Sequence, residues 1–130
     1  MNNKDFTILV TDDNNENLRI VTLILISEGY MLALAQDGES ALKIIEENKI
    51  DLILLDILMP GSLNGFDVCR RLKNNLKTKH IPVIFLSAQT NTENIVEGFK
   101  IGGNDYITKP FNKEELLARV GAHLKRENIF

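Results

Sequence analysis

The chain of 130 residues is predicted to form an α/β fold, a three-layer sandwich around a five-stranded parallel sheet. Five short apolar runs recur along the sequence, and each is followed by turn residues and an amphipathic helical pattern. Runs that are apolar throughout are typical of strands buried on both faces of a parallel sheet. Strand and helix therefore alternate, and right-handed crossovers place helices on both faces of the sheet.

The predicted strands are aliphatic or β-branched: Phe6–Thr11, Leu32–Gln36, Asp51–Asp56, Pro82–Ser87 and Asp105–Thr108. Open α/β sheets bind ligands outside the carboxyl ends of their strands, so we expect the chemistry at that edge.

The first two helices are indicated by capping residues and by inward-facing apolar positions. Asn14 or Asn15 opens the first helix, which ends near Gly29, and Asp37-Gly38 opens the second. The inward positions are Leu18, Val21, Leu25, Ala41, Leu42 and Ile45. A Glu39–Lys43 pair is expected on the outer face of the second helix.

The last three helices carry similar signals. Gly65 precedes the third helix, and Thr90-x-x-Glu93 and Asn112-x-x-Glu115 have the capping-box pattern for the fourth and fifth. Gly102-Gly103 ends the fourth helix. The expected apolar stripes are Phe66, Cys69, Leu72 and Leu76, then Ile95, Val96 and Phe99, then Leu116, Leu117, Val120 and Leu124.

Composition excludes several classes of protein. The net charge is −3 and no Lys/Arg block exceeds two residues, so we expect no direct contact with nucleic acid. The longest apolar stretch, Ile20–Ile26, is far shorter than a membrane span, so we expect a soluble, cytoplasmic protein without a membrane partner. Cys69, the single cysteine, is expected to be buried. His80 and His123 lack metal-ligand spacing and are expected at the surface or partly packed.

Six polar residues lie at or just beyond the ends of the apolar runs and predict one phosphoryl-transfer site: Asp12, Asp13, Asp56, Ser87, Tyr106 and Lys109. An aspartate carboxylate can act as a nucleophile toward phosphorus. Two unit charges about 5 Å apart repel by roughly 3 kcal/mol at an effective dielectric near 20, so an anion approaching these acids requires a cation. Mg²⁺ suits oxygen ligands, and Lys109 supplies a second positive charge.

Across nearly its whole length, the chain resembles the receiver domain of bacterial two-component response regulators. The matching segments are ILVTDDNNENLR, DLILLDILMP, GFDVCRRLK, IPVIFLSA and DYITKPF, in that order. The resemblance implies a flavodoxin-like (βα)5 fold with strand order 2-1-3-4-5. It also implies one receiver domain over residues 1–130, which can be part of a larger multidomain protein.

The resemblance assigns a role to each motif residue. Asp56 is the implied phosphoacceptor, and the implied ligands of Mg²⁺ or Mn²⁺ are Asp12, Asp13, Asp56 and the Leu58 carbonyl. Lys109, Ser87 and Ala88 are the implied phosphoryl contacts, Ser87 and Tyr106 the switch pair, and Leu58 and Gln89 the residues that tune hydrolysis. The bond matching Lys109–Pro110 is cis in the family.

The implied partners are a sensor histidine kinase or a phosphotransfer protein, and a fused or separate output domain. Phosphorylation is expected to draw Ser87 toward the phosphoryl oxygen, which vacates space into which Tyr106 can turn inward. This change is expected to remodel the face formed by the fourth helix, fifth strand and fifth helix. Asp105 and Arg119 match a pair that joins receivers across this face, with Arg126 farther along. We expect a monomer or a weak phosphorylation-dependent homodimer.

Two departures from the family pattern stand out. The stretch from Asp56 to Gly65 has one residue more than is usual, in the loop Pro60–Asn64, and Asn64 replaces a common aspartate. Gly103 replaces a common alanine, which is expected to loosen the end of the fourth helix.

Taken singly, each site residue has an ordinary explanation. Asp12 and Asp13 would favour a helix start, Asp56 would suit a turn, Ser87 would be solvated, Tyr106 would belong to the core and Lys109-Pro110 would form a turn.

Three other functions fit less well. A haloacid-dehalogenase-like phosphatase needs a second acid where Leu58 stands, and a flavodoxin-type carrier cannot cradle phosphate with DDNNE. A phosphorylation-independent interaction module would normally lack one acid or the lysine. The sequence therefore predicts a signalling phosphoacceptor that catalyses only its own phosphorylation and dephosphorylation.

Overall fold

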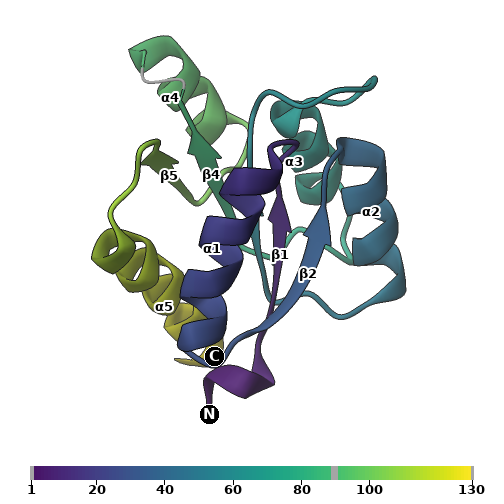
Figure 1. Cartoon of the computed structure of the whole chain (residues 1–130). Coiled ribbons are helices and arrows are strands. Elements are labelled where there is room, and N and C mark those ends of the chain that lie inside the picture. The colour runs from purple at the N-terminus through teal and green to yellow at the C-terminus, as the bar shows by residue number, and fades with distance from the viewer. Residues whose placement is uncertain (1, 89–90, 130) are drawn as a thin grey trace.

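In the computed structural model, which describes residues 2–88 and 91–129, five parallel strands form one sheet in the order β2-β1-β3-β4-β5 (Figure 1). The strands are β1 (Thr7–Thr11), β2 (Met31–Ala35), β3 (Leu52–Leu55), β4 (Val83–Ser87) and β5 (Asp105–Thr108). The helices are η1 (Asn3–Asp5), α1 (Asn15–Ser27), α2 (Gly38–Glu47), α3 (Gly65–Lys73), α4 (Thr92–Lys100) and α5 (Lys113–Ile129). The predicted fold and strand order are confirmed, and strand ends differ from the prediction by one residue or less.

Two apolar cores lie on opposite faces of the sheet. One packs α1 and α5 against the sheet, through side chains that include Leu25, Leu116 and Val120. The other packs α2 and α3 against the opposite face, with Ile95 of α4 at its border. The central strands β1, β3 and β4 are almost completely buried, which explains their unbroken apolar sequences.

Capping residues begin the helices much as predicted. The side chain at each helix start accepts a hydrogen bond from the backbone N–H three residues later. The pairs are Asn14 and Asn17 N at α1, Asp37 and Ser40 N at α2, and Asn112 and Glu115 N at α5. The cap of α4 was predicted wrongly: Asn91 accepts from Asn94 N there, and Thr90 lies outside the described residues.

Three further details differ from the predictions. Gly65 is the first residue of α3 rather than the residue before it, and Asn64 and Asp67 form a capping box. Leu76 lies beyond the end of α3 and is 81% exposed. Glu39 forms no ion pair with Lys43 among the described residues, since its Oε1 accepts from Ser62 N and Oγ.

Within the part of the chain that the structure describes, no helix combines the length and the apolar character needed to cross a membrane.

Candidate functional site

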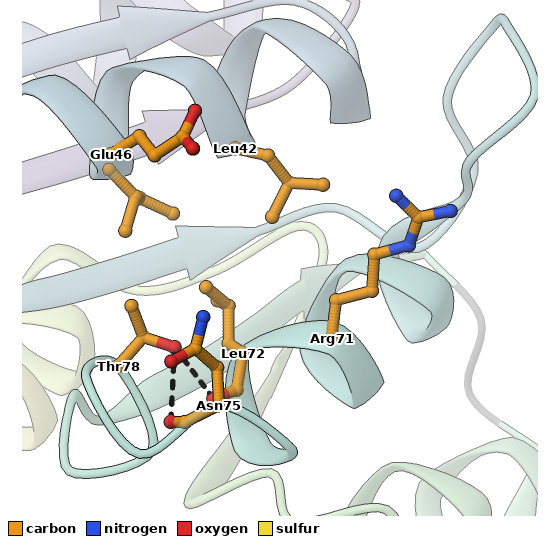
Figure 2. A pocket seen from close by; sticks show the side chains of 7 residues that line it. Leu42, Glu46, Arg71, Leu72, Asn75 and Thr78 are labelled. Carbon is orange, nitrogen blue, oxygen red and sulfur yellow. Dashed lines mark hydrogen bonds between the residues drawn. The ribbon is translucent and has the colours of Figure 1, made fainter.

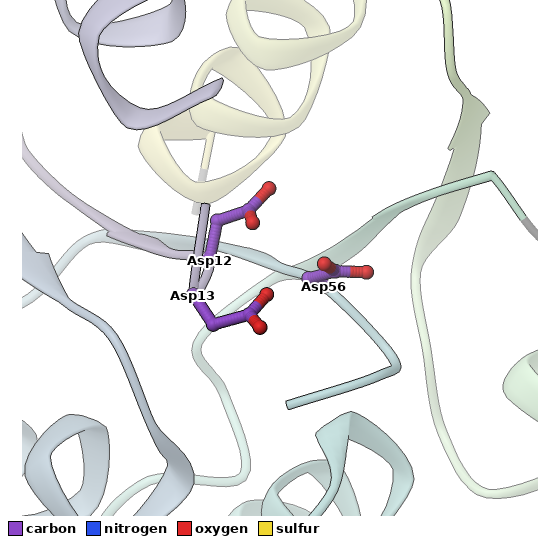
Figure 3. A group of neighbouring side chains, drawn as sticks. All are labelled: Asp12, Asp13 and Asp56. Carbon is purple, nitrogen blue, oxygen red and sulfur yellow. The ribbon is translucent and has the colours of Figure 1, made fainter. Parts of the chain in front are cut away.

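Three carboxylates meet at the carboxyl edge of the sheet (Figure 3). Asp12 and Asp13 follow the last residue of β1, and Asp56 follows the last residue of β3, the neighbouring strand. Asp56 N donates to Thr11 O (2.9 Å), which fixes the two strand ends side by side. One carboxylate oxygen from each aspartate lies within 4.8 Å of the others.

Lys109 joins this group from the turn after β5. Its Nζ lies 2.7 Å from Asp12 Oδ2 and 3.3 Å from Asp56 Oδ2, and its backbone N donates to Ser87 O (2.8 Å). The Lys109–Pro110 peptide bond is cis, as the sequence resemblance implied. The acids and the lysine therefore come together from three separate strand ends.

The electrostatics of the site centre on Asp56. Asp12 is 2% exposed and Asp56 8% exposed, so both carboxylates are largely removed from water, whereas Asp13 is exposed. Burial raises the pKa of Asp56 to about 6, the Lys109 ammonium works in the opposite direction, and the charge of Asp12 raises it further. Asp12 and Asp56 thus share the Lys109 ammonium group, and the Asp13 carboxylate lies beside them.

An excess of buried negative charge and an all-oxygen donor set are the conditions that favour a divalent cation such as Mg²⁺. The residues present therefore fit the metal that the sequence predicts.

Ser87 and Tyr106 lie on adjacent strands next to the acids. Ser87 is 1% exposed and Tyr106 is 9% exposed. Burial raises the pKa of Tyr106, and a hydrogen bond with the Ser87 side chain opposes this effect. Tyr106 is therefore already buried in this structure, whereas the sequence analysis expected it to turn inward only after phosphorylation.

The remaining predicted residues surround the acids. Leu58 is 59% exposed beyond β3, Ala88 is exposed after β4, and Gln89 lies outside the described residues. The loop with the additional residue leaves the acid edge intact, because Gly65 N still donates to Ile57 O (2.8 Å). A Cβ at Gly65 would lie 2.2 Å from Asp56 O, so only glycine permits this approach.

Comparison with known proteins agrees with this geometry. The family model for the response regulator receiver domain matches residues 8–121. The chain belongs to this family.

The receiver is 42% identical over 121 residues to the DNA-binding response regulator MtrA of Mycolicibacterium paratuberculosis, covering 93% of this chain and 52% of MtrA. It is 40% identical to the nisin biosynthesis regulatory protein NisR of Lactococcus lactis, covering 94% of this chain and 52% of NisR. The receiver thus spans about half the length of these relatives.

Solved structures of receivers superpose closely. A putative response regulator from Chloroflexus aurantiacus has a TM-score of 0.88 and 36% identity, covering 92% of this chain and 98% of that one. The receiver domain of the Francisella response regulator 1452 has a TM-score of 0.86 and 37% identity, covering 93% and 98%. The chain is therefore a receiver domain of a two-component response regulator in both sequence and fold.

The sequence analysis missed a second charged group in this receiver. Arg119 Nη1 lies 2.9 Å from Asp105 Oδ1, and His123 Nε2 lies 3.0 Å from Asp105 Oδ2. His123 is 8% exposed, so it is more buried than the surface or partly packed position that was expected, whereas His80 is exposed. The spacing of Arg119 and His123, four residues apart on one helix, was the available signal.

A groove of about 330 Å³ lies between α2 and the end of α3 (Figure 2). Its lining residues are Leu42, Ile45, Glu46, Arg71, Leu72, Asn75 and Thr78. None of these belongs to the acid group, so the groove is separate from the candidate site.

Proposed function

We propose that this receiver accepts a phosphoryl group on Asp56 in a Mg²⁺-dependent reaction. The observation that supports the proposal is the environment of Asp56: a buried carboxylate 3.3 Å from Lys109 Nζ and within 4.8 Å of the Asp12 and Asp13 carboxylates. Among the described residues, Asp12, Asp13 and Asp56 are the group of acids whose carboxylates lie close enough together to hold a metal ion, and Lys109 pairs with two of them, Asp12 and Asp56.

The reaction is a transfer from a phosphohistidine. An Asp56 carboxylate oxygen attacks phosphorus, the P–N bond breaks as the P–O bond forms, and the imidazole leaves as its nitrogen takes up a proton. Asp12, Asp13, Asp56 and the Leu58 carbonyl would hold Mg²⁺ or Mn²⁺. Bound there, the ion supplies the positive charge that offsets the acids and the incoming phosphate oxygens.

Other residues of the chain position the phosphoryl group. Lys109 now contacts both Asp12 and Asp56, and its ammonium can donate to a phosphoryl oxygen from the same place. Ser87 can donate to a second oxygen, and Ala88 contacts the group with a side chain small enough to leave it room. Leu58 and Gln89 are proposed to flank the path of the water that later hydrolyses the acyl phosphate.

The phosphodonor must reach this edge from outside. A groove of about 260 Å³ lies beside Lys109, between α1 and the turn before α5. It is lined by Asn17, Ile20, Ile24, Lys109, Pro110, Phe111 and Lys113. We propose that a sensor histidine kinase or a phosphotransfer protein docks there, because an apolar contact at this place brings its phosphohistidine next to Asp56.

The consequence of phosphorylation is proposed to be a two-state switch. Ser87 and Tyr106 are already linked, so a phosphoryl group that engages Ser87 would stabilise the buried position of Tyr106 rather than create it. The face formed by α4, β5 and α5 would then select a fused or separate output domain. The net charge of −3 supports an output through such a partner rather than through nucleic acid bound directly by this chain.

The test is labelling with acetyl phosphate and Mg²⁺, read as a mass increase of one phosphoryl group. Wild type is expected to gain one group, and Asp56→Asn none. Asp51→Asn is the matched control, because Asp51 lies at the opposite end of β3 and binds Thr7 N. Labelling that persists in Asp56→Asn would contradict the proposal. A wild type that never labels would favour a phosphorylation-independent interaction module.

A further inference from the structure

Phe85, at the middle of β4, is the central ring of a row of three aromatic side chains. Its ring centroid lies 5.3 Å from that of Phe66 of α3, edge to face, and 6.1 Å from that of Tyr106 of β5. Phe85 is 1% exposed. Each such aromatic pair stabilises a fold by about 0.5–1.5 kcal/mol in addition to the effect of burying its apolar surface. The row therefore packs the proposed switch aromatic directly against a ring of the core.

The edge of the Phe85 ring lies against the main chain at the end of α4. A Cβ at Gly103 would lie 2.6 Å from Phe85 Cε2, and a Cβ at Gly98 would lie 3.1 Å from Phe85 Cδ2 and Cε2. Neither glycine has a positive φ, so close packing rather than backbone conformation disfavours a side chain at these positions. At Gly98 the contact would be tight, and at Gly103 a Cβ would also lie 2.7 Å from Gly98 O.

This geometry corrects an expectation from the sequence. Gly103 was expected to loosen the end of α4, but its N donates to Gly98 O (2.9 Å) and the Phe85 ring fills the space that a methyl group would take. The two glycines instead form a flat surface that fits the ring edge.

We propose that Phe85 is a positioning residue that couples Tyr106 to α4, with Gly98 and Gly103 as its complementary surface. Tyr106 packs on one part of the ring and the α4 main chain on another. Because a close-packed interior does not compress, a displacement of Tyr106 is passed to α4 through this ring. The inference rests on the proposed function, since it specifies how a change at Asp56 and Tyr106 reaches α4.

The experiment follows Tyr106 and α4 separately while beryllofluoride is added with Mg²⁺. Tyr106 is observed by ¹⁹F NMR in fluorotyrosine-labelled protein that carries Tyr30→Phe. Helix α4 is observed through a fluorinated tag on Val96→Cys, since Val96 is 44% exposed. Cys69 stays untagged because it is buried and its pKa is raised to about 11.

In the wild-type background both signals are expected to change together. In Phe85→Leu we expect the ¹⁹F signal of Tyr106 to change as in wild type. The change in the ¹⁹F signal of the tag on α4 is expected to be about fivefold smaller, a factor at the lower end of the usual coupling between sites. Ile84→Val is the matched control, because Ile84 is the preceding residue on β4 and faces the core beneath α1 and α5. It should leave both responses intact.

A second comparison tests the packing itself. Gly103→Ala is expected to lower the melting temperature when Phe85 is present, and to lower it less when Phe85→Leu removes the ring contact, because the contact with Gly98 O remains in both backgrounds. An α4 response in Phe85→Leu equal to that of wild type, or a Gly103→Ala effect that is the same in both backgrounds, would overturn the coupling. If wild type neither labels at Asp56 nor responds at Tyr106, the proposed function fails instead.

Discussion

Asp56, directly after β3, is buried, and Asp105, the first residue of β5, is partly buried. The two aspartates have opposite electrostatic environments. Asp56 shares Lys109 with Asp12, and burial raises its pKa to about 6. Burial also acts to raise the pKa of Asp105, but hydrogen bonds from His123, Tyr106 N and Arg119 lower it overall. The same residue type is thus poorly compensated at one site and well compensated at the other.

The difference separates the proposed phosphoacceptor from an aspartate that joins two elements of the fold. Asp105 has the partners that an ionised carboxylate needs inside a protein, so it ties β5 to α5. Asp56 shares the Lys109 ammonium with Asp12, and burial outweighs that contact, so its ionised form costs free energy until a further cation is supplied. Stability measurements on variants of the two aspartates should therefore give opposite signs.

The largest expected effect is the pH dependence that Asp56 causes in chelator. A pKa raised from 3.8 to about 6 means that the fold binds the proton more tightly than the unfolded chain does. The Asp56 contribution to stability is therefore complete below pH 3.8 and is lost as pH rises through 6, by about 3 kcal/mol. Urea unfolding from pH 4 to 7 measures it. Asp56→Asn should remove this component, and a wild-type profile identical to that of Asp56→Asn would contradict the account.

At Asp105, the change in the free energy of unfolding on substitution is expected to have the opposite sign. Asp105→Asn leaves Arg119 and His123 without their carboxylate, so we expect a loss of about 1–2 kcal/mol of unfolding free energy at pH 7. Because the folded pKa is lowered, the native stabilisation is present above about pH 4 and is lost as pH falls through the folded value. Urea unfolding at pH 7 should rank Asp105→Asn below wild type and Asp56→Asn above it. An Asp105→Asn protein as stable as wild type would show that this group contributes nothing.

Magnesium should supply the positive charge that the Asp56 site needs, and so make its electrostatic environment more like that of Asp105. At ten times its dissociation constant, one bound ion stabilises the fold by about 1.4 kcal/mol through mass action. We expect this gain in melting curves of wild type and of Asp105→Asn, and little or none in Asp13→Asn, which lacks one proposed ligand. Neutralising Asp13 should also raise the stability of the metal-free protein, by on the order of 1 kcal/mol. Equal magnesium shifts in wild type and Asp13→Asn would exclude a metal site there.

A smaller effect is expected at Leu58, beside Asp56. Leu58 is 59% exposed and offers a passing water no hydrogen bond. Leu58→Asn would provide one, and a hydrogen bond of about 1 kcal/mol corresponds to about fivefold faster hydrolysis of the phosphorylated protein. The decay of the phosphorylated mass measures the lifetime. A lifetime that is unchanged or longer would show that Leu58 does not control the access of water.

The smallest effect is expected from Arg119 in pairing between receivers. Arg119 already binds Asp105 of its own chain, so it has little to contribute to a second copy. Exposed ion pairs contribute about 0–1 kcal/mol, so Arg119→Ala should weaken a beryllofluoride-dependent dimer by about fivefold at most. Sedimentation with and without beryllofluoride measures this. A tight dimer without beryllofluoride would contradict the expected monomer.

Interactions between residues close together in the sequence made the strands and most helix starts of this receiver predictable. Unbroken apolar runs are typical of strands buried on both faces of a parallel sheet, and Asn14, Asp37 and Asn112 cap helices through bonds that span three residues. The convergence of Asp12, Asp56 and Lys109 also followed from the sequence, because the carboxyl ends of parallel strands share one edge. Their chemical roles came from the resemblance to receivers rather than from these patterns.

Contacts between distant residues were decided only by the tertiary structure. The cap of α4 is Asn91, one residue beyond the predicted one, and its side chain accepts from Asn94 N. Burial of His123 depends on Asp105, which lies 18 residues away on another element. The need for glycine at position 103 depends on the Phe85 ring and on Gly98 O, which occupy the space that a Cβ would take. Periodicity and capping report the neighbours of a residue along the chain, whereas burial, pKa and close packing depend on which distant side chains share its space.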